Sequence, residues 1–264
     1  MDAARLAARH HANMIATMGL LAGQVPGGVV RRSAGVAIIS SGIDFLLFNQ
    51  VVVDGAATTP DAIVAAVSVM RDRGPRFAVN LRVGTDDRCV PIMAELGLVP
   101  LSADPWMPGM ALHPLPDDRS PAPPDGHDIR RVTDAAGLDD HIRTAAAGFE
   151  MPEALMRSVM PLGVIGSEIA AFYVGYTDGQ PVTTGAGIRT GRTIGLYSIA
   201  TLSGARGRGY GAAMTRRIAA DGATAGCDVA ILQASAMGYA LYERLGYRTV
   251  VEYMAYTEPG PASV

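Results

Sequence analysis

The sequence predicts a mixed α/β protein made of two similar domains, of which the first is degenerate and the second complete. Three observations support this prediction. Strand-like and helix-like segments alternate along the second half of the chain, a proline-rich stretch divides the chain near its middle, and part of the same order of elements recurs in both halves. Strands followed by an αβαβ order are typical of a mixed sheet with helices on both faces.

The composition fits this size and class. The chain has 264 residues, 49% of them hydrophobic, with a net charge of -3, so it can bury one large core or two cores of about 130 residues each. The slightly acidic balance argues against binding to nucleic acid or to anionic membranes. All 22 basic residues are arginine, which excludes Schiff-base and P-loop lysine chemistry. We expect Cys89 and Cys227 to be buried thiols in a reducing compartment, because two cysteines make neither a disulfide framework nor a zinc site.

The first 24 residues require a choice between two interpretations. Arg5 and Arg9 precede an apolar stretch over 14–22, an order loosely similar to a signal peptide. The spacing of Leu6, His10 and Ile15 instead favours an amphipathic helix. Since no segment reaches about 18 uninterrupted apolar residues, no membrane span is predicted. We therefore expect a cytoplasmic protein that begins with a helix.

A linker is expected where the chain reads HPLPDDRSPAPPDG, over residues 113–126. Its prolines and aspartates cannot continue a helix or a central strand. The predicted division is a first domain over 1–115, a proline-rich linker over 116–126 and a second domain over 127–264.

Turn and capping signals define the elements of the second domain in order. Thr133 or Asp134 provides an N-cap for the first helix, and the turn at 178–181 predicts a hairpin. The expected strands are 128–132, 168–177, 182–189, 193–202, 228–233 and 247–257, and the expected helices are 134–149, 152–160, 209–224 and 236–245.

The first domain repeats part of this order. A shift of 149 residues places 47–49 on 196–198 and 96–98 on 245–247. Between these two anchors lie a helix over 60–73, a strand over 77–83 and a helix over 88–96. This agreement predicts a duplicated domain, although coincidence remains an alternative because few residues are identical.

The segment that carries chemistry is the turn TLSGARGRGYGA at 201–212. Glycine lets backbone N–H groups turn toward one point, and the N-terminus of the following helix adds a partial positive charge. Arg206 and Arg208 add cationic donors suited to phosphate. The turn therefore predicts a pyrophosphate site, and the alternative is a flexible turn that binds nothing.

A second segment, QASAMGYALYERLGY at 233–247, adds to this pattern. Tyr242 is followed by Gly246 and Tyr247, while Arg206, Gly209 and Gly211 meet the pattern [QR]-x-x-G-x-[GA]. With these two motifs, residues 128–258 resemble the GNAT acyltransferase superfamily, and the doubled arrangement resembles its tandem members. The resemblance implies an acyl-CoA site between the strands at 193–202 and 228–233.

The resemblance also implies a role for each motif position. Ser235 would contact the CoA arm, and it can also cap the following helix. Tyr242 would protonate the leaving thiolate, although a core aromatic is the alternative. Backbone contacts to the pantetheine arm are implied for Ile199, Ala200 and Thr201, and contacts to the pyrophosphate for Arg206, Gly207, Arg208, Gly209, Tyr210, Gly211 and Ala212.

The general base is missing from its usual place. Many members of the superfamily carry a glutamate on the strand before Ser235, and this chain has Ala230 there. Glu150, Tyr197 and Ser198 are the candidates that remain open, together with an amine that arrives already deprotonated.

The first domain is not expected to bind CoA. The 149-residue shift places Ala57–Ala62 on Arg206–Gly211, without glycine or arginine. Pro60 has no N–H to donate, Asp61 would repel a phosphate, and Met93 stands where the second domain has Tyr242.

We expect an acetyl-CoA-dependent N-acyltransferase that acts on the amine of a small molecule or peptide, with acetyl-CoA as cosubstrate and no metal. A CoA-binding sensor without turnover is one alternative. A dinucleotide-binding oxidoreductase is another, because Gly207, Gly209 and Ala212 also satisfy G-x-G-x-x-[GA], although Asp228 begins its strand rather than ending it. No nucleic-acid or membrane partner is expected, and the acceptor, the acyl chain and a homodimer are left open.

Overall fold

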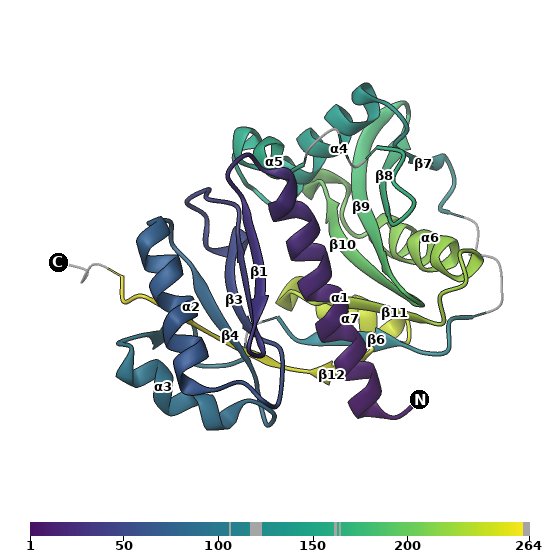
Figure 1. The fold of residues 1–264 in the computed structure, drawn as a ribbon. Helices are drawn as coiled ribbons and strands as arrows, with labels where there is room; N and C mark the ends of the chain where they lie inside the picture. Colours follow the sequence, from purple (N-terminus) through teal and green to yellow (C-terminus); the bar gives the residue numbers. More distant parts are fainter. Residues whose placement is uncertain (106, 117–122, 161–162, 164, 261–264) are drawn as a thin grey trace. The chain divides into compact units, whose positions relative to one another are not determined.

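The computed structural model describes the chain except for residues 106, 117–122, 161–162, 164 and 261–264 (Figure 1). The chain divides into two compact units. Unit 1 comprises Met1–Asn13 and Met110–Val250, and unit 2 comprises Met14–Gly109 and the segment from Val251 onward. Each unit is built around its own mixed sheet.

Unit 1 contains a seven-stranded sheet in the order β12-β6-β11-β10-β9-β8-β7. β10 and β11 are parallel, whereas β7, β8, β9 and β10 form antiparallel pairs. The strands are β6 (Gly109–Leu112), β7 (His127–Arg131), β8 (Ala170–Thr177), β9 (Gln180–Thr190), β10 (Thr193–Thr201), β11 (Val229–Gln233) and β12 (Arg248–Val251).

Helices cover both faces of this sheet. Successive residues of β8 point to opposite faces. Phe172 meets His141 of α4 (Ala135–Gly148), while Tyr173 donates a hydrogen bond to Asp221 of α6 (Tyr210–Thr224). α4 and α6 therefore lie on opposite faces. Unit 1 also contains α5 (Glu153–Val159), α7 (Ala236–Arg244) and the first part of α1 (Ala3–Gln24).

Glycines in β9 bring α6 close to the sheet. A Cβ built on Gly185 would lie 2.7 Å from Met214 Cγ and Ile218 Cδ1, and one built on Gly187 would lie 2.8 Å from Ile218 Cγ2. Larger residues would push the helix away. The N-terminal end of α6 is thereby held against the end of β10, where the sequence predicts the pyrophosphate site.

Unit 2 contains a six-stranded sheet in the order β1-β2-β3-β4-β13-β5. Its helix α2 (Pro60–Arg73) buries Ile63, Val67 and Met70 in the core of the unit, together with Met93 of α3 (Val90–Glu95). The strands are β1 (Val29–Ser33), β2 (Val36–Ser40), β3 (Asn49–Val53), β4 (Ala78–Arg82), β5 (Val99–Pro100) and β13 (Tyr253–Thr257).

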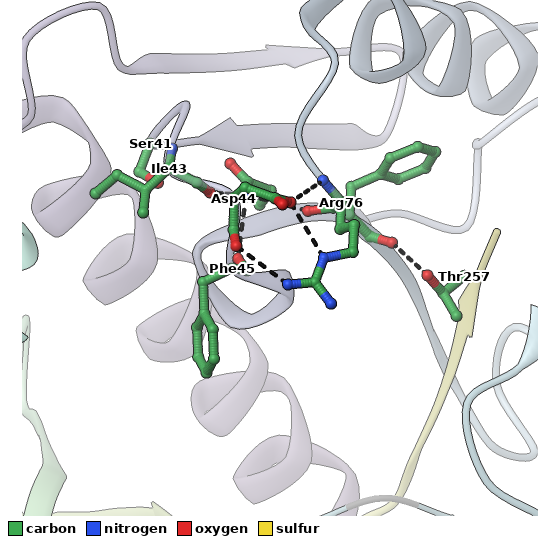
Figure 2. Close-up of polar contacts among 8 residues, drawn as sticks. Ser41, Ile43, Asp44, Phe45, Arg76 and Thr257 are labelled. Atoms are coloured by element: carbon green, nitrogen blue, oxygen red, sulfur yellow. Dashed lines mark hydrogen bonds and ion pairs between the residues drawn. The ribbon is translucent and has the colours of Figure 1, made fainter. Parts of the chain in front are cut away.

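A polar network fixes the segment that precedes β3. Figure 2 shows Asp44 accepting hydrogen bonds from the backbone N–H and the Nε of Arg76, at 2.9 and 3.1 Å. The amide of Asn49 donates to the carbonyls of Ile43, Phe45 and Arg76. Residues 46–48 form a 3-10 turn, η1 (Leu46–Phe48), rather than a strand.

The conformation of this segment shows that one of the two matches behind the predicted repeat is wrong. Residues 47–49 were matched to 196–198, but 47 and 48 lie in η1, whereas 196–198 lie inside β10. The other anchor agrees with the structure. The N–H of Leu98 donates to the Met93 carbonyl, and the N–H of Tyr247 donates in the same way to the Tyr242 carbonyl, at 2.9 and 3.0 Å.

The two halves of the chain exchange strands. β6 comes before the linker but pairs within the sheet of unit 1, between β11 and β12. β13 comes at the end of the chain but pairs with β4 and β5 in unit 2. The expected single strand over 247–257 is therefore two strands in different sheets. This division differs from the predicted boundaries at 115 and 127, and most of the predicted linker, 117–122, lies outside the described residues.

Most of the other elements lie where capping signals placed them. Asp134 caps α4 by accepting from the N–H of Gly137, and Asp178 and Gly179 turn the β8–β9 hairpin with positive φ. Cys89 and Cys227 are free and buried, as expected. Among the described helices, none combines the length and the apolar character that a membrane span needs.

Candidate active site

A one-residue bulge interrupts the pairing of β10 with β9. Tyr197 pairs with Ala186 and Ala200 with Thr184, so three steps on β10 match two on β9. Ser198 takes the extra position with a φ of 52°, a left-handed conformation that non-glycine residues rarely adopt. The bulge bends β10 at the point where the resemblance places the acyl-CoA site.

The pairing of β10 with β11 ends at the same point. These parallel strands pair from Thr193 with Val229 to Leu196 with Leu232, and β10 then continues to Thr201. The five residues after Leu196 therefore extend beyond the ladder with β11. Within them, Ala200 is buried, while Ile199 and Thr201 are half-buried. This is the strand segment whose backbone the sequence analysis assigns to the pantetheine arm.

Two threonines of β9 hold the bulge in place. Thr184 Oγ1 donates to the carbonyl of Ser198 at 2.9 Å, and Thr183 Oγ1 donates to the carbonyl of Ala200 at 2.7 Å. Both threonines are fully buried. These bonds give both carbonyl groups a side-chain partner on the neighbouring strand.

The glycine turn leads into α6 without a side-chain cap. Gly207 and Gly209 have φ values of 79° and 83°, and Gly209 is the N-cap. No side chain of the described residues caps this end, so its first N–H groups are available to an anion. A Cβ built on Gly211 would lie 3.5 Å from Thr201 Oγ1 and 3.7 Å from Leu241 Cδ2. The end of β10, the start of α6 and helix α7 thus meet.

The two arginines of the turn have different surroundings. Arg206 donates through Nε to the Thr201 carbonyl at 3.2 Å and through a terminal nitrogen to the Gly148 carbonyl at 3.1 Å. It therefore closes the turn onto β10 and the end of α4. Arg208 is exposed, and it is the cation of the pair that stays available to a phosphate. Tyr210 is buried, with its ring stacked on His127 at 4.2 Å between centroids, so its backbone rather than its phenol faces the turn.

Ser235 caps α7, as one of its two predicted roles requires. Its side chain accepts from the N–H of Gly238 at 3.3 Å. Ser235 is exposed, so the cap leaves room for a second interaction.

Tyr242 lies in the core cluster of unit 1 and is 8% exposed. A Cβ built on Gly238 would lie 2.8 Å from Tyr242 Cε2, so this glycine makes space for the phenol ring. Burial raises the pKa of Tyr242 to about 12. The phenol is therefore fully protonated at neutral pH and is a weaker acid than an ordinary tyrosine.

The candidates for a general base differ in their surroundings. Ala230 is fully buried within the same apolar cluster, where a carboxylate would be strongly desolvated. The Tyr197 hydroxyl donates a hydrogen bond to Asn13 Oδ1 at 2.7 Å, and Glu150 is exposed on the loop after α4. Ser198 differs, because its Oγ lies 3.4 Å from Nε2 of His141.

His141 is a site residue that sequence reasoning missed. It is fully buried on α4, and its Nδ1 lies 3.0 Å from the carbonyl of Tyr173. Burial lowers the pKa of His141 to about 4. A histidine inside an amphipathic helix does not by itself indicate a functional site. The bulge that brings Ser198 close to His141 cannot be predicted from residue types.

Two further observations concern a dinucleotide and a metal ion as ligands. Asp228 precedes β11, at the end of the sheet opposite the glycine turn, and is paired with Arg9 at 2.7 Å. It is therefore not placed to hold the ribose of a dinucleotide. In the part of the chain that the structure describes, no group of three or more histidine, cysteine, aspartate or glutamate side chains could hold a metal ion.

Unit 2 lacks each of these features among its described residues. β3 pairs with β2 without a bulge and ends at Val53, one residue after its last pair with β4. Thr59 caps α2 by accepting from the N–H of Ala62, and Pro60 occupies its first turn. The end of α2 thus has fewer free donors than the end of α6.

A comparison with known families matches part of the chain that holds these elements. Residues 168–249 match the acetyltransferase (GNAT) domain, a segment that contains β8 to β11, α6 and α7. The chain thus carries a GNAT acetyltransferase domain, and the resemblance stated from the sequence is confirmed there. The domain supports acyltransferase activity.

Solved structures extend this likeness over nearly the whole chain. A GCN5-related N-acetyltransferase from Kribbella flavida is 18% identical, with a TM-score of 0.72 over 98% of this chain and 97% of its own. One from Sphaerobacter thermophilus is 17% identical, with a TM-score of 0.60 over 87% and 82%. A tandem GNAT protein from the clavulanic acid biosynthesis pathway is 14% identical, with a TM-score of 0.60 over 97% and 96%.

At these identities the likeness shows the fold, which is the mixed α/β GNAT fold in a tandem arrangement. None of the curated proteins compared with the chain matches it.

Proposed function

We propose that this chain transfers an acetyl group from acetyl-CoA to an amine, at the open end of β10 in unit 1. The observation that carries the proposal is the coincidence of three features at one place. β10 bulges at Ser198, its pairing with β11 ends at Leu196, and the uncapped N-terminus of α6 follows. Together they offer backbone partners for an extended arm and free donors for a pyrophosphate.

The residues present suit this substrate. The N–H groups of the first turn of α6 would bind the pyrophosphate with Arg208, while Arg206 keeps the turn closed. The backbone of Ile199–Thr201 would pair with the pantetheine arm, which places the thioester beside the bulge. Backbone N–H groups there would stabilise the oxyanion, and the Tyr242 hydroxyl would donate to the sulfur as it becomes a thiolate.

Isothermal titration with CoA and with acetyl-CoA tests binding, and release of the CoA thiol in the presence of amines tests turnover. We expect binding at micromolar concentrations or below, and thiol release that depends on the amine. The amine panel should include amino acids, aminoglycosides and small peptides. A protein that binds neither CoA nor acetyl-CoA would contradict the proposal.

A second function is favoured by one observation. Ala230 is buried where many members of the superfamily carry a glutamate base, so a CoA-binding sensor without turnover is the alternative. Tight CoA binding with no thiol release from any amine in the panel would select it.

A further inference from the structure

We infer that Ser198 and His141 form a proton relay that serves as the general base of the acetyl transfer, with Ser198 touching the acceptor amine and His141 acting through it. This inference rests on the proposed function. It assigns a general base to a chain that has the buried Ala230 at the position of the usual glutamate. It also brings together a bulge residue and a histidine 57 positions earlier in the chain.

The hydrogen bonds of His141 determine where its proton lies. A carbonyl oxygen can only accept a hydrogen bond, so the contact of Nδ1 with the Tyr173 carbonyl at 3.0 Å places the proton on Nδ1. Nε2 then carries a free lone pair. That lone pair lies 3.4 Å from the Ser198 hydroxyl, a distance that is often longer before substrate binds than in the reacting complex.

The surroundings keep His141 in its basic form and in one orientation. The imidazole is fully buried, and its ring meets Phe172 edge-on at 5.1 Å. α4 packs against β9 and β10 on this face of the sheet (Figure 1). A neutral imidazole that is held by a carbonyl on one side has its lone pair on the other. Because burial disfavours the imidazolium, this lone pair takes a proton only once the attacking nitrogen has become positively charged.

Ser198 is held in a backbone conformation that costs free energy, and the packing of unit 1 gains nothing evident from it. Its φ of 52° is a left-handed value that glycine or asparagine adopts more easily. The bond from Thr184 to its carbonyl fixes this conformation. Consequently the hydroxyl lies at the start of the open segment of β10, half-buried and next to the strand residues assigned to the pantetheine arm.

The proton movements balance. The neutral amine attacks the thioester carbon, the C–N bond forms, and the carbonyl π electrons move to the oxygen. The nitrogen then loses a proton to Ser198 Oγ, while the Ser198 proton passes to His141 Nε2. The C–S bond breaks as the oxyanion re-forms the carbonyl, and the thiolate takes the Tyr242 proton. After the products leave, the imidazolium returns its proton through Ser198 Oγ to water that enters the emptied site, and the Tyr242 phenolate takes a proton from the same water.

The kinetic test uses hydroxylamine as a small amine probe, with the full chain and acetyl-CoA. We expect Ser198→Ala and His141→Gln to lower kcat by about 10²-fold or more. The KM for acetyl-CoA and the Kd for CoA should stay within about twofold, because neither side chain is assigned to the cofactor arm. Thr144→Val, a buried change one turn further along α4, is the matched control and should keep the wild-type kcat.

A spectroscopic test separates the relay from a structural role. In ¹⁵N spectra of the imidazoles, His141 Nε2 should be unprotonated at pH 7, and Ser198→Ala should shift its resonance while leaving that of His127 unchanged. A proton on Nε2 would overturn the relay. So would a Ser198→Ala variant with the wild-type kcat, provided that the wild type is active. Neither result would affect the proposed function. An acetyl adduct on Ser198 would also overturn the relay, because the serine would then be a nucleophile. A wild type that binds CoA but acetylates no amine would instead refute the proposed function.

Discussion

At the scale of single residues, Tyr242 shows how burial changes a predicted role. A phenol with its pKa raised to about 12 does not ionise near neutral pH, and its acidity no longer matches that of a thiol. In the proposed reaction its contribution would therefore be a hydrogen bond to the sulfur as negative charge develops there. The proton follows only as the C–S bond breaks.

We expect Tyr242→Phe to lower kcat by about 10²- to 10⁴-fold, because the proton donor is lost. The KM for acetyl-CoA should barely change, since the ring that packs in the core is kept. Steady-state kinetics and thermal melting measure the two effects separately. If Tyr242 is only a core aromatic, turnover will match the wild type where chemistry limits the rate.

Gly209 is the N-cap of α6 in the turn that we propose binds CoA. Its φ of 83° is strained for any residue with a Cβ, so Gly209→Val should abolish measurable CoA binding by titration while the chain still folds. Gly204→Ala is the matched control, because Gly204 lies in the same turn with open space around it and without a positive φ. Tight CoA binding by a folded Gly209→Val variant would show that the turn has no part in the site.

At the scale of elements, sequence reasoning located helices better than strands. Residues such as Asp134 and Pro60 mark helix starts directly, and α2 begins and ends as predicted. The strands at 29–33, 36–40 and 109–112 were not predicted at all. The strand at 109–112 pairs with β11 and β12, far along the chain, whereas the other two pair with each other across Ala34 and Gly35. Two-residue periodicity in such short segments is weak.

The candidate site divides in the same way. The glycine turn, Ser235 and Tyr242 carry local motifs, so the sequence alone could propose them. The Ser198–His141 contact could not be predicted, because it depends on a bulge that only the pairing of β9 and β10 reveals.

The contrast between α2 and α6 predicts one CoA site per chain. α6 has an uncapped N-terminus preceded by Arg208, whereas Thr59 caps α2 and Pro60 follows. Titration should give a stoichiometry of one. Arg208→Glu should weaken binding by about 1.5–3 kcal/mol, the range for losing a hydrogen bond to a charged group. Two equivalent sites per chain would show that unit 2 binds as well.

At the scale of the whole molecule, buried histidines make stability depend on pH. Burial lowers the pKa of both His10 and His141 to about 4, below the unfolded value near 6.5. The stability that these groups contribute is fully present above pH 6.5 and is lost as the pH falls toward 4, because the unfolded chain binds protons first. Each should contribute roughly 3 kcal/mol to this loss.

Urea unfolding at pH 7 and at pH 4.5 measures this loss. In a His10→Gln variant the difference between the two pH values should shrink, since one group that binds a proton more tightly in the unfolded chain is removed. An unchanged difference would show that carboxylates such as Asp228, rather than histidines, dominate the acid sensitivity.

The exchange of β6 and β13 predicts that the second half of the chain does not fold alone. A fragment over 126–264 lacks β6, which lies between β11 and β12, and lacks the start of α1. β11 would then expose an unpaired edge. We expect no cooperative thermal unfolding by circular dichroism, whereas the full chain should unfold cooperatively. A cooperative transition of the fragment would contradict this.

The same exchange makes the chain suitable for splitting. A cut between Asp125 and Gly126 leaves two pieces, and each piece carries a strand that belongs to the other's sheet. Such pieces should co-purify without a covalent link, and acetyl transfer should return only when both are present. The chain would thus serve as a two-part reporter whose signal depends on reassembly, because the sheet of unit 1 takes its strands from both pieces.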